Sequence, residues 1–192
     1  MTPAPGRPRL ASKELLQEAA FELFQLRGYR DTSVERIAKT AGFSRATFFN
    51  FFASKAELFW VETDALIDAL RESLAERLAG EDPPPLREAL LAHAGTLRSA
   101  SIPWALQHYR LLEAADDLTA SGASRVLGIN RLFLDYLSRR AMIRGQEAGA
   151  EEAAAPAAEA ATATALLLVA VRAWIDGGIE RGSLREHLER VI

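Results

Sequence analysis

Polar and basic side chains gather at three predicted helix starts between residues 32 and 58. The segment reads TSVERIAKTAGFSRATFFNFFASKAEL, which predicts two short helices around a glycine turn and the start of a third helix directly after them. This geometry places one helix in the major groove of DNA and holds its neighbours on the phosphates. The chemistry that these residues indicate is therefore recognition of DNA.

Residues suited to catalysis or metal binding are few and scattered. The three histidines, His93, His108 and His187, form no metal-ligand set with a carboxylate at a convincing spacing, and the chain has no cysteine. An enzyme would need a nucleophile, an activated acid–base pair or a metal cluster. We therefore expect a protein that is not an enzyme and that holds no metal and no cofactor.

Each predicted helix start carries its own local signal. Thr32 and Glu35 are three residues apart, as in a capping box, and Ser44 is placed to cap the next helix. Gly42 lies between them and suits the positive φ that closes many helices. Ser54 begins a third capping box, of the form S-x-x-E. Caps would be needed without any DNA, but capping alone does not require the whole set in this order.

A further helix is predicted over residues 12–27, with Gly28 at its end. Its apolar residues recur at helical spacing and comprise Leu16, Ala20, Leu23 and Phe24. Two short helices bury too little surface to be stable alone, so this helix is expected to brace them. Together these elements predict a compact three-helix head.

The head resembles that of the tetracycline-repressor-like (TetR) family of bacterial transcriptional regulators. The resemblance is confined to the N-terminal part of the chain, and the remainder is similar to the family only in being helical. The residues that carry it are Ala19, Ala20, Phe24, Gly28, Tyr29, Thr32, Ser33, Val34, Ile37, Ala38, Ala41, Gly42, Ser44, Thr47, Phe52, Lys55 and Leu58.

The resemblance implies a set of DNA-contacting residues. Donors on Thr32 and Ser33 would meet a phosphate at the start of the second helix, and Lys55 would meet another. Arg45 is the candidate for reading a base, because a guanidinium can bond O6 and N7 of guanine together. The complete set is Thr32, Ser33, Ser44, Arg45, Ala46, Thr47, Phe49, Asn50 and Lys55.

The chain departs from the family pattern at Phe49, where the family usually has a tyrosine. The hydroxyl that would bond a phosphate is missing, and only the ring remains to pack against the DNA backbone. We expect the loss to weaken DNA contact by about 1 kcal/mol without changing the mode of binding.

Charge is distributed unevenly along the chain. Residues 1–60 contain nine Lys or Arg against six Asp or Glu, whereas the remainder contains fourteen against twenty. A basic head on an acidic body is consistent with an electrostatic footprint on DNA. The acidic pI of about 5.7 predicts modest, salt-dependent non-specific binding.

The rest of the chain is predicted to be helical, because no run alternates with the period of a strand. Helices are expected over residues 55–78, 86–99, 104–115, 124–144 and 157–179, with a turn at Ser121 and Gly122 and a short last helix capped by Ser183. We therefore predict an all-α protein with two domains. Residues 1–54 would form the arm and helix-turn-helix domain, and residues 55–192 the ligand-binding and dimerisation domain.

The two late helices predict a homodimer. Residues 165–175 are apolar around nearly the whole helix, which is typical of a helix covered on all sides. The resemblance implies a four-helix interface between two subunits, and the expected interface residues are Val126, Phe133, Leu137, Leu167, Val171 and Trp174. A monomer with a well-filled core is the alternative. The apolar run of residues 163–171 is shorter than the ~20 residues that span a bilayer, so no membrane contact and a cytoplasmic location are expected.

The resemblance also implies a pocket for a small apolar or aromatic ligand. Its expected lining is Trp104, His108, Tyr109, Phe133, Tyr136 and Trp174, although each is also a plausible core residue. The function expected is thus a sequence-specific transcriptional regulator, a repressor that a ligand releases from a palindromic operator. The alternative is a ligand-independent DNA-organising protein that uses the same head.

Overall fold

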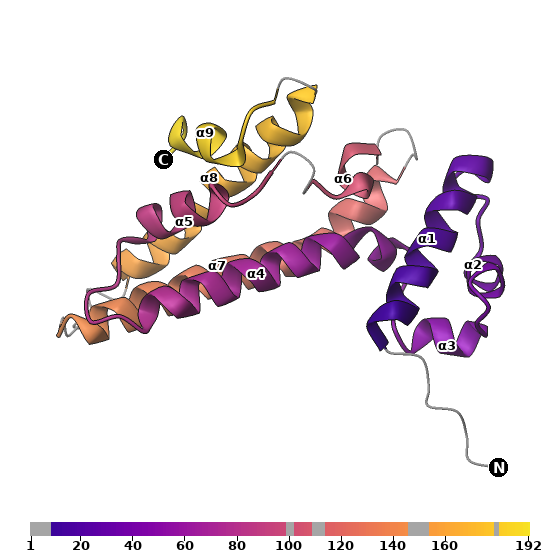
Figure 1. Ribbon diagram of the computed structural model, residues 1–192, viewed down its shortest axis with the longest axis horizontal. Helices are drawn as coiled ribbons and strands as arrows, with labels where there is room; N and C mark the ends of the chain where they lie inside the picture. The colour runs from indigo at the N-terminus through magenta and orange to yellow at the C-terminus, as the bar shows by residue number, and fades with distance from the viewer. Residues whose placement is uncertain (1–8, 99–101, 109–113, 146–153, 179–180) are drawn as a thin grey trace, which may run out of the picture. The chain divides into compact units, whose positions relative to one another are not determined.

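The computed structural model describes residues 9–98, 102–108, 114–145, 154–178 and 181–192. Every regular element within these ranges is a helix, which confirms the predicted all-α class (Figure 1). The chain forms two compact units. Unit 1 comprises residues 1–64 and 104–121, and unit 2 comprises residues 65–103 and 122–192. Packing thus groups residues 55–64 and 104–121 with the head, and the domain boundary expected at residues 54 and 55 stays a prediction.

Unit 1 contains the predicted three-helix head and two later segments. Its helices are α1 (Arg9–Arg27), α2 (Val34–Thr40), α3 (Arg45–Phe49), the 3-10 helix η1 (Lys55–Trp60) and α6 (Trp104–His108). It also includes the start of α4 (Val61–Leu78) and the start of α7 (Ala115–Ile143). Figure 1 shows α1 beside α2 and α3, and α1 contacts both α2 and η1, as expected of a helix that braces them.

Glycines close the first two helices as predicted. Gly28 and Gly42 have φ of 84° and 79°, a conformation that costs other residues energy. After α2, the amide of Gly42 bonds the carbonyl of Lys39 at 3.1 Å, and that of Phe43 bonds the carbonyl of Ala38 at 2.7 Å. This pair of bonds is a Schellman motif, and it sets the sharp turn between α2 and α3.

Of the three caps predicted in the head, two are wrong and one is right. Ser33, not Thr32, is the N-cap of α2, and its hydroxyl accepts from the amide of Arg36. The Thr32 side chain is buried instead, and its hydroxyl donates to the carbonyl of Gly28 at 2.8 Å. Ser54 makes no side-chain cap bond, because a 3-10 helix follows it. Ser44 caps α3 as expected.

The core of unit 1 is built from apolar residues of α1, α2, α3, η1 and the start of α7, together with residues of the turns between them. Phe24, Phe48, Leu58 and Phe59 are almost completely buried, and the rings of Phe24 and Phe59 lie 5.6 Å apart. The remaining core residues are Leu16, Ala20, Leu23, Tyr29, Ile37, Ala38, Phe52, Ala114 and Leu118. The last two come from the start of α7, so this distant segment is part of the folded head.

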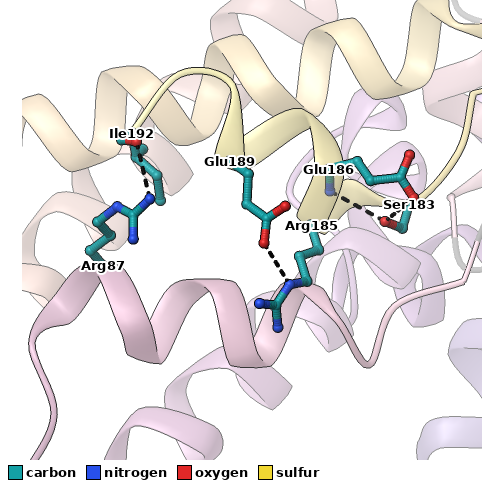
Figure 2. Close-up of polar contacts among 6 residues, drawn as sticks. All are labelled: Arg87, Ser183, Arg185, Glu186, Glu189 and Ile192. Carbon is teal, nitrogen blue, oxygen red and sulfur yellow. Dashed lines mark hydrogen bonds and ion pairs between the residues drawn. The ribbon is translucent and has the colours of Figure 1, made fainter.

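Unit 2 is formed by the rest of α4 and α7 together with α5 (Leu86–Ala94), α8 (Ala154–Asp176) and α9 (Leu184–Glu189). Its core includes Leu74, Phe133, Tyr136, Trp174 and Leu188. The C-terminal α9 contacts both α5 and α8. Figure 2 shows Ser183 capping α9, as predicted, through a 3.2 Å bond from the amide of Glu186.

Several predicted boundaries in the body differ from the structure. α5 ends at Ala94 rather than at residue 99. The helix predicted over residues 104–115 is described only as α6, up to His108, because residues 109–113 lie outside the described ranges. No turn occurs at Ser121, because α7 runs unbroken from Ala115 to Ile143. The Ser121 hydroxyl donates to the carbonyl of Asp117 at 2.7 Å and accepts from the indole of Trp60 at 2.7 Å, so the hydroxyl finds both of its partners while Ser121 stays inside the helix. Residues 146–153, between the helices predicted over residues 124–144 and 157–179, lie outside the described ranges.

Candidate nucleic-acid interface

The start of α3 presents several of the predicted DNA-contacting side chains. The Ser44 hydroxyl accepts from the amide of Thr47 at 3.0 Å and lies 2.9 Å from the Thr47 hydroxyl. Arg45, Ala46 and Asn50 are exposed. The helix is held from behind by Phe48, which is completely buried. A helix of five residues is thus kept in place by one cap and one core ring, with its polar side open.

Arg45 is held by two neighbours. Its guanidinium forms an ion pair with the carboxylate of Glu35 on α2 and lies over the ring of Phe49, 5.4 Å from the ring centre. Both charged side chains are more than half exposed. A backbone hydrogen bond, with smaller contributions from Arg45 and Ser33, lowers the pKa of Glu35 below its usual value. The carboxylate therefore stays ionised at neutral pH and remains a partner for Arg45.

Phe49 serves as a platform at the surface. Its ring is 45% exposed and meets the ring of Phe48 edge-on at 5.4 Å. The face of an aromatic ring attracts a cation, so Phe49 orients Arg45 without needing a hydroxyl. The Phe49 ring can therefore support Arg45, a role that does not need the hydroxyl of the tyrosine that the family usually has here.

The start of α2 exposes Ser33 but not Thr32. Ser33 is at the surface and caps the helix, whereas the Thr32 side chain is only 1% exposed. The amide of Thr32 bonds the carbonyl of Tyr29 at 3.3 Å. Because both donors of Thr32 are used inside unit 1, the structure does not place them at the surface where a phosphate would bind.

Lys55 is tied to the turn between α1 and α2. Its ammonium donates to the carbonyls of Tyr29 and Thr32, the latter at 3.0 Å, and lies 3.9 Å from the centre of the Tyr29 ring. Burial lowers the pKa of Lys55, and the charges of Asp117 and Asp31 oppose that shift. Contact of Lys55 with a phosphate stays a prediction, because in this structure its donors face the protein backbone.

Sequence reasoning missed the partners of these residues. Glu35 was expected to complete a capping box, and nothing in the local pattern pairs it with Arg45. Asp117 accepts a hydrogen bond from Tyr29 across 88 residues of chain, a contact for which no local signal exists.

The predicted ligand-lining residues do not form one described site. Phe133, Tyr136 and Trp174 lie together in the core of unit 2. The Tyr136 hydroxyl donates to the carbonyl of Pro84 at 2.7 Å, and the Trp174 indole donates to the carbonyl of Gly182 at 3.1 Å. Their polar ends are thus used by the fold. His108 and Trp104 belong to α6 in unit 1; the Trp104 side chain and all of Tyr109 lie outside the described structure.

Most residues predicted for the dimer interface are buried or partly buried within unit 2 itself. Phe133, Leu137 and Trp174 are buried in unit 2 itself, and Leu167 and Val171 pack against the same core. Val126 is half-buried. The large apolar residues exposed on α7 and α8 include Leu127 (66%), Val169 (54%) and Leu168 (39%). The dimer interface stays a prediction, and these three exposed residues are the apolar surface on which we base the proposal of a dimer.

Two other features of the described residues concern metal ions and membranes. Among the described residues, no group of His, Asp and Glu side chains could hold a metal ion. Within the same residues, α8 is long and apolar enough to cross a membrane by length and composition, and 17% of its most apolar window is buried. The core helix of a soluble protein passes the same test, so this finding is weak evidence for a membrane.

Comparisons with known proteins agree with this geometry. Residues 16–60 match the family model of bacterial regulatory proteins, tetR family. The chain is 29% identical over 138 residues to the putative mycofactocin biosynthesis transcriptional regulator MftR of Mycobacterium tuberculosis, covering 70% of this chain and 68% of that protein. It is 40% identical over 75 residues to the HTH-type transcriptional regulator TcmR of Streptomyces glaucescens, covering 39% of this chain and 33% of that protein.

A solved structure covers most of the chain. The crystal structure of Thermus thermophilus FadR, a TetR family transcriptional repressor in complex with lauroyl-CoA, matches with a TM-score of 0.60 and 26% sequence identity. The match covers 93% of this chain and 90% of that chain, so the likeness extends well beyond residues 16–60.

Proposed function

We propose that this chain is a transcriptional regulator of the tetR family, which binds a palindromic DNA operator as a homodimer and leaves it when a small molecule binds. The observation that carries DNA binding is the exposed start of α3, where Arg45 is oriented by Glu35 and Phe49. A guanidinium so held can bond both major-groove acceptors of guanine. Because the partner is DNA, we expect the protein in the cytoplasm.

Dimerisation is supported by the exposed apolar side of α8. Ala160, Thr164, Ala170 and Trp174 face the core of unit 2, while Leu168 and Val169 remain exposed. A helix with one side already in a protein core is better completed by a second subunit than by lipid. Two subunits would place two copies of α3 about 34 Å apart, which predicts a palindromic operator.

The ligand class is proposed from a solved relative. The similar FadR structure holds lauroyl-CoA, so a long-chain acyl thioester is the first compound to test, followed by small apolar and aromatic molecules. A ligand that binds the folded protein raises its melting temperature by mass action. The alternative, a DNA-organising protein without a ligand, predicts no such shift with any compound.

The decisive experiment is selection of DNA by the purified protein from a random-sequence pool. We expect the recovered sequences to share a palindrome, and we call the best of them the selected duplex. Fluorescence anisotropy across a salt series then compares the selected duplex with a scrambled duplex of the same composition. Sequence-specific regulation requires tighter binding to the selected duplex at every salt concentration. Recovery of no common sequence would instead favour the DNA-organising alternative.

A further inference from the structure

We infer that Asp117, in the first turn of α7, is a positioning residue for DNA contact. Asp117 and Lys55 together hold the turn between α1 and α2 in place. That turn sets the position of the start of α2, which would contact a phosphate. The inference rests on the proposed DNA binding. It adds to the DNA-binding machinery a residue that lies outside the family-matched segment of residues 16–60.

Tyr29 is the part of the turn that Asp117 holds. The Tyr29 side chain is 4% exposed, and its hydroxyl donates to Oδ2 of Asp117 at 2.7 Å. Its ring packs edge-on against Phe24 at 5.1 Å and lies 5.4 Å from the ring of Phe59. A buried hydroxyl needs a partner, and a carboxylate is a strong acceptor. Asp117 therefore fixes the hydroxyl end of the Tyr29 side chain, whose ring already packs against Phe24 and Phe59.

Lys55 holds the backbone of the same turn from another direction. Its ammonium donates to the carbonyls of Tyr29 and Thr32, and the amide of Thr32 bonds the carbonyl of Tyr29. The Thr32 hydroxyl adds a bond to the carbonyl of Gly28. The turn is thus tied to α1, to η1 and to α7, and the residue that directly follows it, Ser33, caps α2.

The start of α7 is itself anchored in unit 1. Ala114 and Leu118 are 1% and 6% exposed in the core of unit 1, and the Ser121 hydroxyl accepts from the Trp60 indole at 2.7 Å. Asp117 lies between these anchors on the same helical turns. Asp117 is exposed, but the helix backbone that carries it is anchored on both sides, so its carboxylate is held beside the Tyr29 hydroxyl.

Three variants separate positioning from simple electrostatics. Asp117→Ala removes the acceptor and one negative charge, and Tyr29→Phe removes the same hydrogen bond without changing charge. Asp116→Ala is the matched control, because Asp116 is exposed in the same acidic first turn of α7. If charge alone mattered, both aspartate variants would bind DNA more tightly. If Asp117 positions the turn, Asp117→Ala and Tyr29→Phe each weaken binding to the selected duplex, on the order of ten-fold, while Asp116→Ala does not.

A double variant and a conservative variant test whether Asp117 acts through its hydrogen bond with Tyr29. The double variant Tyr29→Phe with Asp117→Ala should lose no more affinity than either single variant, because both remove one interaction. Asp117→Asn keeps an oxygen that accepts from Tyr29 and should bind more tightly than Asp117→Ala. Additive losses, or tighter binding by Asp117→Ala, would overturn the inference.

Hydrogen exchange tests the clamp without DNA. In the free protein, Asp117→Ala and Tyr29→Phe should accelerate amide exchange over residues 32–37 and leave α9 unchanged. Unchanged exchange over residues 32–37 would overturn the clamp, and equal acceleration everywhere would show only a loss of overall stability. If the wild-type protein recovers no preferred sequence from the random pool, the proposed function fails, while the exchange data still decide the clamp.

Discussion

Arg45 carries the proposed reading of DNA at the scale of single residues. Its guanidinium contacts Glu35 and the ring of Phe49, so the side chain is ordered before any DNA arrives. Ordering a long side chain in advance reduces the entropy that binding would otherwise cost. Phe49 therefore contributes through its ring.

Arg45→Ala should relax base preference at one position of the selected duplex and cost about 1–3 kcal/mol of binding free energy. Lys55→Ala should weaken binding to the selected and scrambled duplexes alike, since Lys55 supports the α1–α2 turn and contacts no base. Anisotropy titrations with single-base variants of the selected duplex measure both effects. Equal losses on the selected and scrambled duplexes for Arg45→Ala would contradict its assigned role.

Glu35→Gln should raise affinity for scrambled DNA more than for the selected duplex, by roughly two- to five-fold. The carboxylate repels phosphates and holds Arg45 in one orientation, so its loss relaxes selectivity. The control is Glu22→Gln, which removes one exposed negative charge from α1. An unchanged ratio of the two affinities in Glu35→Gln would show that the ion pair does not contribute to selectivity.

Among the elements, α8 carries the proposed dimer. One side of α8, with Ala160, Thr164, Ala170 and Trp174, is buried in unit 2. Leu168 and Val169 lie on a side of α8 that is exposed. The exposed apolar residues, which include Leu168 and Val169, are those on which the proposed second subunit would pack.

Val169→Glu should convert the dimer into a folded monomer, raising the dimer dissociation constant by roughly 100-fold or more, because an unpaired charge would be buried between subunits. Sedimentation velocity measures the change. Ala69→Glu, at an exposed position of α4, is the matched control and should remain dimeric. A Val169→Glu protein that still dimerises would place the interface elsewhere.

At the scale of the whole molecule, the two proposed functions, DNA binding and dimerisation, fall in different units. Unit 1 carries the DNA-contacting residues, and unit 2 carries most of α7 and all of α8. A dimer built through unit 2 would bring two copies of unit 1 to one operator. Linking two weak binding events in this way raises the overall affinity.

Inserting five base pairs at the centre of the selected duplex should lower affinity about 100-fold or more. The two half-sites would then lie on opposite faces of the DNA, and one dimer could not contact both. Anisotropy with the two duplexes tests this. Affinity that is unaffected by the insertion would mean that each subunit binds alone.

Local signals determined the helix ends that depend on a few neighbouring residues. Gly28 and Gly42 close α1 and α2, and Ser44 and Ser183 cap α3 and α9, because these bonds form between residues that are close in the chain. The resemblance of residues 19–58 to a known DNA-binding head was visible for the same reason. Helical spacing also predicted the all-α class.

Tertiary packing decided the roles that local spacing leaves open. Thr32 and Ser33 are adjacent hydroxyl residues, and only the position of α1 determines that Thr32 turns inward while Ser33 caps α2. Likewise, Ser121 lies inside α7 rather than in a turn, and its hydroxyl accepts from the indole of Trp60, which is distant in the chain. The contact between Tyr29 and Asp117 joins residues far apart in the chain, so it exists only once α7 has packed into unit 1. A hydrogen bond between residues that are distant in the chain forms only when the fold brings them together. A short segment of sequence holds no information about such a contact.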